Sequence, residues 1–282
     1  MPLARRRSKK RARTGTEPSS KRRESDARKP KPLPLVERTN ALTLEEFLSL
    51  YIPSSELEFQ KLRTRSEEEA IASITRDGEN PGHDQPNIST ETQQDKYTLD
   101  IYTAGTIPAA DLNACFQLIE LTSSTAYKNS KLGWSPAEKK KEMKLPDMKY
   151  MILRRGGPGV VVPHGITESE RDGSCRGEFA GFLEFMVTYE DGYEVLYCYE
   201  IHLMPEAQGR GLGEELMVRF GRIGARIGLE KAMLTVFKSN PRAITFYERV
   251  GYTEDENSPR PRKLRNGTLK EADYQIMSKR LP

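Results

Sequence analysis

The stretch Gln208-Gly-Arg-Gly-Leu-Gly213 lies between a run typical of a strand and a run typical of a helix. The preceding run, Tyr193-Glu-Val-Leu-Tyr-Cys-Tyr-Glu-Ile-His-Leu203, is rich in β-branched and aromatic residues, which favours a strand. After the stretch, apolar residues recur with helical spacing, at Leu212, Leu216, Phe220, Ile223 and Ile227. The first backbone N–H groups of such a helix are unpaired within it, and with the positive end of the helix dipole they bind phosphate. Because glycine lets a phosphate approach the backbone, the stretch predicts a site for a phosphate-bearing cofactor.

Two features narrow the class of phosphate site. The spacing is Gln-x-x-Gly-x-Gly without the terminal Gly-Lys-Ser/Thr of a P-loop, which argues against nucleoside triphosphate hydrolysis. The strand before the turn is expected to pair antiparallel with residues 179–188 across Glu190-Asp-Gly192, as a hairpin. A dinucleotide-binding fold would instead need a parallel βαβ unit.

The remaining pattern predicts one α+β domain over residues 97–282. Further strands are expected at residues 97–103, 150–153, 232–237 and 274–277. Helices are expected after Asp111 as N-cap, over residues 134–143, and between the N-cap Asn240 and Gly251. Residues 35–96 are expected to form an N-terminal segment, helical over 42–73 and then a polar linker.

The positive charge of the chain is concentrated at its N-terminus. Residues 1–32 hold thirteen Lys or Arg and three acidic residues, for a net charge of +10, whereas the whole chain carries +4. This composition predicts a disordered basic tail over residues 1–34, and its two basic clusters are spaced like a two-part nuclear localisation signal. The alternative is a solvated tail with general affinity for acidic surfaces. The rest of the chain carries −6, which favours a basic partner.

Composition also predicts some absences. No apolar run approaches the roughly 18 residues of a membrane span, and the basic N-terminus lacks the apolar core of a secretory signal. The cysteines and histidines, three of each, are widely spaced and include no Cys-x-x-Cys pair, so we expect no metal site and no disulfide framework.

A second motif, Asn240-x-x-Ala243-x-x-x-Tyr247-x-x-x-Gly251-Tyr252, follows the glycine turn one strand later. Together, the two motifs resemble the GNAT acetyltransferase superfamily. Within it, the chain resembles the type D N-terminal acetyltransferases, which acetylate histone N-termini. The segments that carry this second resemblance are Glu194-Val-Leu-Tyr-Cys-Tyr-Glu200, Met233-Leu-Thr-Val-Phe-Lys-Ser-Asn240 and Tyr127-Lys-Asn-Ser-x-x-Gly-Trp134, with Glu138-Lys and Glu142-Met after it. The resemblance covers roughly residues 97–280 and implies the GNAT fold, a mixed, mostly antiparallel twisted sheet flanked by helices.

The resemblance also implies the activity, transfer of acetyl from acetyl-CoA to an N-terminal serine amine, and a set of site residues. Acetyl-CoA would be bound by Ile201, His202, Leu203, Gln208, Gly209, Arg210, Gly211, Leu212, Gly213, Glu214 and Asn240. The catalytic residues would be Glu200 as base, Tyr199, and Tyr247 as the acid that protonates the leaving thiolate. The substrate peptide would be bound by Tyr127, Tyr199, Thr235, Ser258 and Tyr274. Each of these positions has an ordinary structural alternative, such as a tyrosine packing in a half-buried sheet.

The pattern conflicts with the expected site at one place. Strict alternation puts Tyr199 and Glu200 on opposite faces of their strand. Both can reach one site only if the strand bulges or splays there, and GNAT folds are known for a splay between their fourth and fifth strands.

The chain also departs from the type D pattern. Thr188 stands where a substrate-contacting acid is expected, and Leu132 stands where a second tryptophan is common. Tyr247 matches the general GNAT tyrosine, whereas the type D enzymes usually carry Phe. Residues 156–178 form an insertion without a counterpart.

These observations leave three functions open. The first is N-terminal acetylation of core histones that begin Ser-Gly-Arg-Gly, in the nucleus and cytoplasm, with the tail read by an import receptor and no membrane partner. The second is GNAT acetylation of a lysine or another amine, whose pKa near 10.4 (for lysine) demands a stronger base. The third is a catalytically silent chromatin-binding module.

Overall fold

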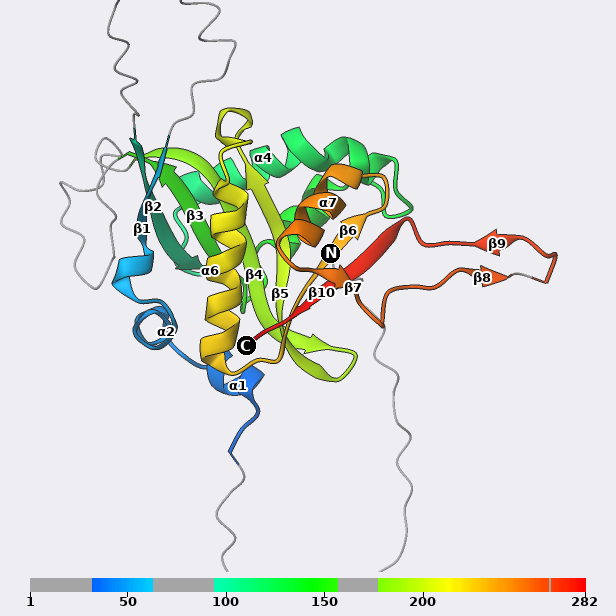
Figure 1. Ribbon diagram of the computed structural model, residues 1–282, viewed down its shortest axis with the longest axis horizontal. Helices are drawn as coiled ribbons and strands as arrows, with labels where there is room; N and C mark the ends of the chain where they lie inside the picture. Colours follow the sequence, from blue (N-terminus) through cyan, green and yellow to red (C-terminus); the bar gives the residue numbers. More distant parts are fainter. Residues whose placement is uncertain (1–31, 63–93, 157–176, 264) are drawn as a thin grey trace, which may run out of the picture.

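The computed structural model describes residues 32–62, 94–156, 177–263 and 265–282. Their centre is a twisted eight-stranded sheet in the order β1-β2-β3-β4-β5-β6-β10-β7 (Figure 1). All neighbouring strands are antiparallel except β5 and β6, so the predicted mixed, mostly antiparallel sheet is confirmed. The strands are β1 (Glu58–Leu62), β2 (Gln94–Thr103), β3 (Lys149–Arg155), β4 (Glu178–Glu190), β5 (Tyr193–Leu203), β6 (Lys231–Phe237), β7 (Thr253–Glu254) and β10 (Tyr274–Arg280).

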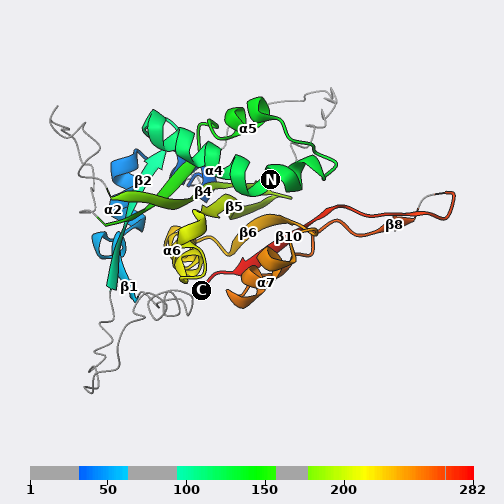
Figure 2. The same ribbon diagram turned by 90° about the horizontal axis from the view of Figure 1, so that it is seen from above.

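Helices cover both faces of the sheet, with α4 and α5 on one face and α6 and α7 on the other (Figure 2). Each face has its own apolar core: one joins β2–β6 to α1, α2, α6 and α7, and the other joins β2–β4 to α4 and to Met143, which follows α5. The α-helices are α1 (Leu35–Asn40), α2 (Leu44–Tyr51), α4 (Ala109–Lys128), α5 (Pro136–Glu142), α6 (Leu212–Ile227) and α7 (Pro241–Arg249). Short 3₁₀ turns η1 (Ser54–Glu56) and η4 (Pro205–Ala207) complete them. None of the described helices is long and apolar enough to cross a membrane.

The N-terminal segment differs from the expectation of a separate helical unit. Helix α2 starts at a capping box of Thr43 and Glu46, but it ends at Tyr51 because Ile52 precedes a proline and is extended. Residues 58–62 then pair with β2 as an edge strand of the main sheet. The buried ring of Phe47 lies 6.4 Å from that of Phe185 on β4. Residues 35–62 therefore share the sheet and core of the domain expected to begin at residue 97.

Helix α4 also starts differently from the prediction. It begins at Ala109 after Pro108, so Asp111 lies in its first turn and is not the N-cap. The Asp111 carboxylate instead accepts a hydrogen bond of 2.8 Å from Arg154, which donates another of 2.6 Å to Asp100. This buried charge cluster explains why an acid that resembles a cap lies inside the helix.

Two predicted local structures are confirmed. The β4–β5 hairpin turns at Asp191 and Gly192, whose φ angles of 46° and 91° are those of a left-handed two-residue turn. Helix α7 has Asn240 as N-cap, with its side-chain oxygen accepting from the N–H of Ala243 at 3.1 Å.

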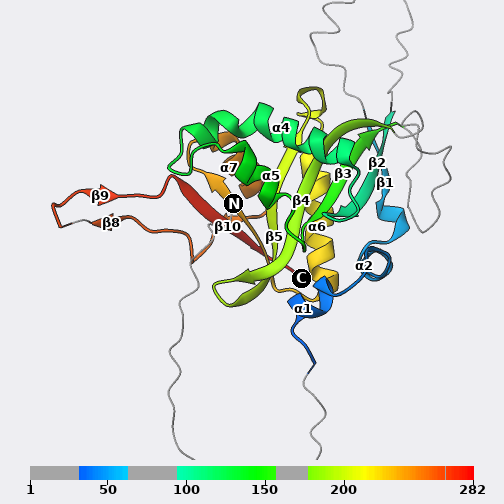
Figure 3. The same cartoon turned by 180° about the vertical axis from the view of Figure 1, so that it is seen from behind.

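A small second sheet of β8 (Arg262–Lys263) and β9 (Leu269–Lys270) forms a hairpin that projects away from the domain beyond β10 (Figures 1 and 3). The basic tail to residue 31, most of the expected linker and residues 157–176 of the expected insertion lie outside the described residues.

Candidate active site

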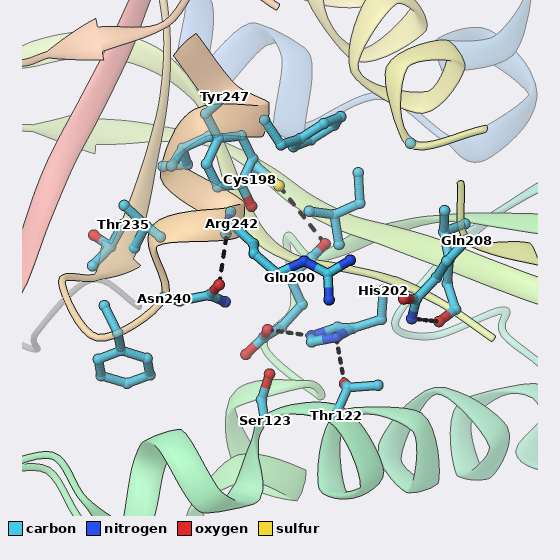
Figure 4. Close-up of a pocket in the computed structure, with 18 of the residues that line it drawn as sticks. Thr122, Ser123, Cys198, Glu200, His202, Gln208, Thr235, Asn240, Arg242 and Tyr247 are labelled. Carbon is cyan, nitrogen blue, oxygen red and sulfur yellow. Dashed lines mark hydrogen bonds and ion pairs between the residues drawn. The ribbon is translucent and has the colours of Figure 1, made fainter. Parts of the chain in front are cut away.

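A cavity of about 600 Å³ lies between β5 and β6. Its walls come from both strands, from α4, and from the beginnings of α6 and α7 (Figure 4). A cavity of this size suits a small-molecule ligand, and it opens at the turn that the sequence predicts to hold phosphate.

The cavity exists because two strands separate. β5 and β6 pair only over Leu196, Tyr197 and Cys198, and beyond Cys198 the backbone of β5 has no partner on β6. On its other side, β5 contains a bulge, because Glu184 pairs with Glu200 while the next residue, Phe185, pairs with Cys198. Tyr199 is the extra residue, so the predicted bulge and splay are both confirmed. The bulge lets Tyr199 and Glu200 line the same cavity.

The glycine turn forms one end of the cavity. Gly209 and Gly211 have φ angles of 74° and 73°, a left-handed conformation that glycine adopts without strain. Gly211 is the N-cap of α6 and supplies no side-chain cap, which leaves the first N–H groups of the helix free for an anion. The Gln208 side chain donates to the carbonyl of Leu203 at 3.1 Å and so ties the turn to the end of β5.

Glu200 lies at the centre of a buried polar network. One carboxylate oxygen, Oε1, accepts hydrogen bonds from Tyr127 at 2.7 Å and from Lys139 Nζ at 2.6 Å. The other, Oε2, lies 2.7 Å from Nε2 of His202 (Figure 4). Lys139 is only 1% exposed and also donates to Glu142 at 2.6 Å. Helix α5 thus delivers a buried cation to the carboxylate on β5.

The network fixes protonation states. Burial alone would raise the pKa of Glu200, but the charge of Lys139 and the hydrogen bond with His202 hold that pKa well below its usual value. Burial would lower the pKa of Lys139, but the neighbouring charge of Glu200 raises it. Burial, and then the charge of Glu200, raise the pKa of Tyr127. Glu200 is therefore an anion and Lys139 a cation at neutral pH, and Tyr127 keeps its proton.

His202 is also held from α4. Its Nδ1 lies 2.7 Å from the hydroxyl of Thr122, and its ring packs 5.6 Å from that of Phe182. From the sequence, His202 is expected only among the cofactor-binding residues. Neither Lys139 nor Thr122 is expected to be a site residue. Lys139 lies in the charged run of residues 138–142, which is typical of a solvated helix face. The one signal for it in the sequence is its place in the Glu138-Lys pair, which is part of the resemblance to the type D enzymes.

Tyr247 lies in the cavity wall, on α7. Burial, followed by the electrostatic influence of Cys198 and of the Glu200 carboxylate, raises the pKa of its phenol well above the usual value. The hydroxyl therefore stays protonated at neutral pH and can donate a proton to a more basic atom.

The structure brings most of the expected cofactor residues to the cavity. Those that line it are Ile201, His202, Leu203, Gln208, Gly209, Gly211, Leu212, Gly213, Glu214 and Asn240. The exception is Arg210, which does not line the cavity; its guanidinium donates to Asp95 on β2 at 3.1 Å.

The expected peptide-binding residues divide in a similar way. Tyr127, Tyr199, Thr235 and Tyr274 line the cavity. Ser258 does not: it is buried, and its hydroxyl oxygen accepts from the N–H of Ile276 at 3.2 Å, which ties the loop after β7 to β10. Of the two departures noted in the sequence, Leu132 lies in the cavity lining, whereas Thr188 pairs with Val195 along β4 and does not line it.

Chemically, the cavity combines an anion cradle, a free strand backbone, a buried carboxylate and a protonated phenol. These are the groups required to hold a phosphate-bearing acyl donor beside an amine and to handle the protons of acyl transfer. Among the described residues, no group of three or more His, Cys, Asp or Glu is placed to hold a metal ion.

Residues 129–252 match the family model described as "Acetyltransferase (GNAT) family". The chain is 27% identical to N-alpha-acetyltransferase 40 of Saccharomyces cerevisiae over 165 residues, 53% of this chain and 54% of that protein. It is 38% identical to mycothiol acetyltransferase of Streptomyces griseus over 95 residues, 33% of this chain and 29% of that protein. The chain thus spans about half or less of the length of these curated relatives.

Among solved structures, the spermidine N-acetyltransferase from Vibrio cholerae, in complex with CoA and spermine, is similar with 17% identity and a TM-score of 0.41. The match covers 64% of this chain and 95% of that one. The family match spans the strands that separate, the glycine turn and α7, which are the parts that build the cavity. The similarity to the GNAT acetyltransferase family therefore falls on the part of the chain that builds the cavity.

Proposed function

We propose that this protein transfers acetyl from acetyl-CoA to the N-terminal α-amine of a peptide, and that the peptide is the Ser-Gly-Arg-Gly terminus of core histones. The observation that carries the proposal is the position of Glu200. Its carboxylate lies where β5 leaves β6, in one cavity with the glycine turn and with Tyr127, Tyr199 and Tyr274.

The donor side of the cavity suits acetyl-CoA. The free N–H groups at the start of α6 and the turn at Gly209 and Gly211 would hold its pyrophosphate. The backbone of residues 201–203 has no partner on β6 and would bind the extended pantetheine arm. Acetyl-CoA supplies the activated thioester carbonyl, and the protein has to orient it and manage two protons.

The acceptor side suits an α-amine. A free α-amine has a reference pKa near 7.7–8.0, so about 10–20% of it is already neutral at pH 7 and a weak base is sufficient. The anionic Glu200 attracts the ammonium form into the cavity and takes part in removing its proton, directly or through water. Lysine, with a pKa near 10.4, would need a base that is stronger by more than two pKa units. A carboxylate whose pKa is held down by Lys139 is a poor match for that task.

Three further observations support the choice of substrate. The relative from yeast with 27% identity carries the name N-alpha-acetyltransferase 40, and its match spans 165 residues. The chain outside the basic tail is acidic, with a net charge of −6 beyond residue 32, and this charge attracts a basic peptide. The tyrosines of the cavity each offer a flat apolar wall and one hydroxyl, which suit a short peptide backbone.

The test uses two synthetic Ser-Gly-Arg-Gly peptides that contain one lysine, one with a free and one with a blocked N-terminus. Each is incubated with the full-length protein and acetyl-CoA, and the products are measured by mass spectrometry. We expect one acetyl group on the free peptide and none on the blocked one. Acetylation of the blocked peptide at lysine, with none on a free α-amine, would overturn the proposal in favour of a lysine acetyltransferase.

A variant separates an enzyme from a silent binding module. Glu200→Gln should lower turnover by on the order of 10²-fold or more, since positioned acid–base groups contribute that much. It should leave the dissociation constant for acetyl-CoA within a few-fold, because the cradle lies at the other end of the cavity. An equal loss in both would move Glu200 to a structural role, and a wild-type protein without turnover would favour the binding module.

We also propose that residues 1–34 direct the protein to the nucleus through an import receptor, and that the protein occurs in nucleus and cytoplasm. The support is the charge pattern alone, since residues 1–31 lie outside the described residues. Deleting residues 1–32 should abolish nuclear accumulation of a fluorescent fusion and leave activity on the short peptide unchanged. Loss of peptide acetylation would show that the tail is part of the enzyme's working structure.

A further inference from the structure

Both ring nitrogens of His202 have a hydrogen-bonding partner. Nε2 lies 2.7 Å from Oε2 of Glu200, and Nδ1 lies 2.7 Å from the hydroxyl of Thr122. The histidine thus links β5 to α4 across one side of the cavity (Figure 4). The identity of the partners decides where its protons are.

The hydroxyl of Thr122 is the first constraint. It lies 2.7 Å from the carbonyl of Leu118, one helical turn earlier, and a carbonyl can only accept. The single Thr122 proton is therefore used in that bond, and the hydroxyl oxygen must accept from Nδ1 of His202. Nδ1 carries a proton.

The carboxylate of Glu200 is the second constraint. Its Oε1 accepts from Tyr127 and Lys139, and an ionised carboxylate has no proton to donate. The short contact at Oε2 then requires a proton on Nε2 of His202. With both nitrogens protonated, the ring is an imidazolium. The pair of His202 and Glu200 then holds one proton more than a neutral imidazole beside an ionised carboxylate would hold.

The charges around the pair agree with this assignment. The ammonium of Lys139 on α5 pairs with the carboxylates of Glu142 and Glu200, so these three groups have a net charge of −1. The imidazolium of His202 brings the net charge of the buried cluster to zero. Glu184 on β4 adds no charge below its pKa, which burial raises to about 8. On α4, Tyr127 stays neutral. The other charged residues that line the cavity are Glu214 on α6 and Arg242 and Arg249 on α7.

From this geometry we infer that His202 is the proton reservoir of the active site, a positioning and proton-holding residue that acts through Glu200. The inference rests on the proposed acetyl transfer for its role in turnover. The proposed step requires the pair to lose this proton first, so that Glu200 is an anion and His202 is neutral when the amine reacts. After reaction, the proton taken from the amine resides on Nε2 of His202.

The amine nitrogen forms a bond to the thioester carbonyl carbon, the carbon–sulfur bond breaks, and sulfur leaves with the electron pair. One proton passes from the amine nitrogen to Glu200, directly or through water, and from there to Nε2 of His202. The thiolate takes a proton from Tyr247, and the stored proton on the pair returns the phenol to its neutral form or leaves to solvent. The net products are an amide and a thiol.

The kinetic test compares the wild type with His202→Gln, whose amide can still donate to Glu200 but cannot titrate. At low pH, log kcat/KM should rise with a limiting slope of about 2 in the wild type, because the substrate amine and the His202–Glu200 pair must each lose a proton. In His202→Gln the slope should be about 1, which reports the amine alone. Equal slopes in the two proteins would overturn the inference.

Thr122 provides a matched pair of variants. Thr122→Val keeps the shape of the side chain and removes the acceptor for Nδ1, so it should shift the acid limb of the wild-type profile to lower pH. Thr122→Ser keeps the hydroxyl and should restore the wild-type profile. A structural defect alone would lower kcat in Thr122→Val without moving the limb, and that result would count against the inference.

A spectroscopic test needs no turnover. The chain has three histidines, so the ¹⁵N spectrum of the histidine-labelled full-length protein is assigned by difference with His202→Gln. We expect both nitrogens of His202 to be protonated at about pH 6. A neutral ring at about pH 6 would overturn the inference. Protonated nitrogens in a protein that fails to acetylate peptides would instead locate the failure in the proposed function.

Discussion

Replacing Lys139 by Met should destabilise this protein more than any other single change to a charged residue on α5. The side chain is 1% exposed, and its ammonium donates to Glu200 and Glu142, each at 2.6 Å. Methionine keeps the length and the packing of the stem but removes the charge. The variant therefore leaves Glu200 as a buried anion that has lost its lysine partner and keeps only the contacts with Tyr127 and His202.

The magnitude follows from that unpaired anion. Removing one partner of a buried pair costs about 3–5 kcal/mol of the free energy of unfolding. The tyrosine and histidine bonds to Glu200 remain, which places the expected loss at the lower end, about 3 kcal/mol. Adding Glu200→Gln removes the orphaned charge, so the double variant should recover about 1–2 kcal/mol of that loss through the coupling between the two sites.

The pH dependence has a definite sign. Because the folded-state pKa of Glu200 is depressed, the stability that it contributes is present above its unfolded pKa, near 4.3, and is lost as the pH falls through the folded value. Without Lys139 this contribution is gone at every pH. The gap between the wild type and Lys139→Met should therefore be full at pH 7 and shrink as the pH falls below about 4.3.

Urea unfolding followed by circular dichroism at several pH values measures these free energies. Lys141→Met is the matched control, since Lys141 is exposed on the same helix and should change stability by less than about 0.5 kcal/mol. A Lys139→Met loss no larger than that of the control, or a gap that stays constant as the pH falls, would refute the buried ion pair as the organising contact of the site.

Three further predictions concern the cradle, the phenol and a second buried acid. Gly211→Val should weaken acetyl-CoA binding, measured by calorimetry, because valine does not readily adopt the φ of 73° at this position. The control Gly267→Val, at a φ of 84° on the projecting hairpin, should leave the binding unchanged. Equal effects of the two variants would contradict the phosphate-binding role of the glycine turn. Tyr247→Phe should lower kcat by on the order of 10²-fold with unchanged acetyl-CoA affinity, and an unaltered kcat would reduce Tyr247 to packing. Burial raises the pKa of Glu184 to about 8, so between about pH 5 and 8 the folded state keeps a proton on this carboxyl that the unfolded chain has lost. The free energy of unfolding should therefore fall by up to about 1.4 kcal/mol for each unit by which the pH rises in this range. Glu184→Gln should flatten that slope in urea unfolding, and an unchanged slope would count against a buried neutral Glu184.

The parts of the site that depend on local sequence could be predicted. The glycine turn, the hairpin at Asp191 and Gly192, and the cap at Asn240 each follow from the conformational preferences of a few adjacent residues. The bulge at Tyr199 was predicted for another reason, because two neighbouring strand residues were both required at one site. This prediction came from the expected roles of Tyr199 and Glu200, because the local sequence pattern alone indicates a regular strand.

The parts that depend on contacts between distant segments could not be predicted. Lys139 and Glu200 are 61 residues apart, and a lysine in a charged helix reads as solvated until the strand that it covers is known. His202 and Thr122 are 80 residues apart. The protonation of the His202 ring therefore depends on a contact with α4, which the sequence around His202 does not indicate. The edge strand β1 was missed because its alternation is short and follows directly on a helix.

We expect the cavity to acetylate an α-amine in preference to a lysine amine. The most direct measurement places both amines in one molecule: a Ser-Gly-Arg-Gly peptide extended by lysine, incubated with the full-length protein and limiting acetyl-CoA, with the acetyl group located by fragmentation in the mass spectrometer. We predict that acetyl appears on the terminal serine nitrogen and that this product is strongly reduced with Glu200→Gln. Acetyl on the lysine side chain, with the serine amine unmodified, would contradict it.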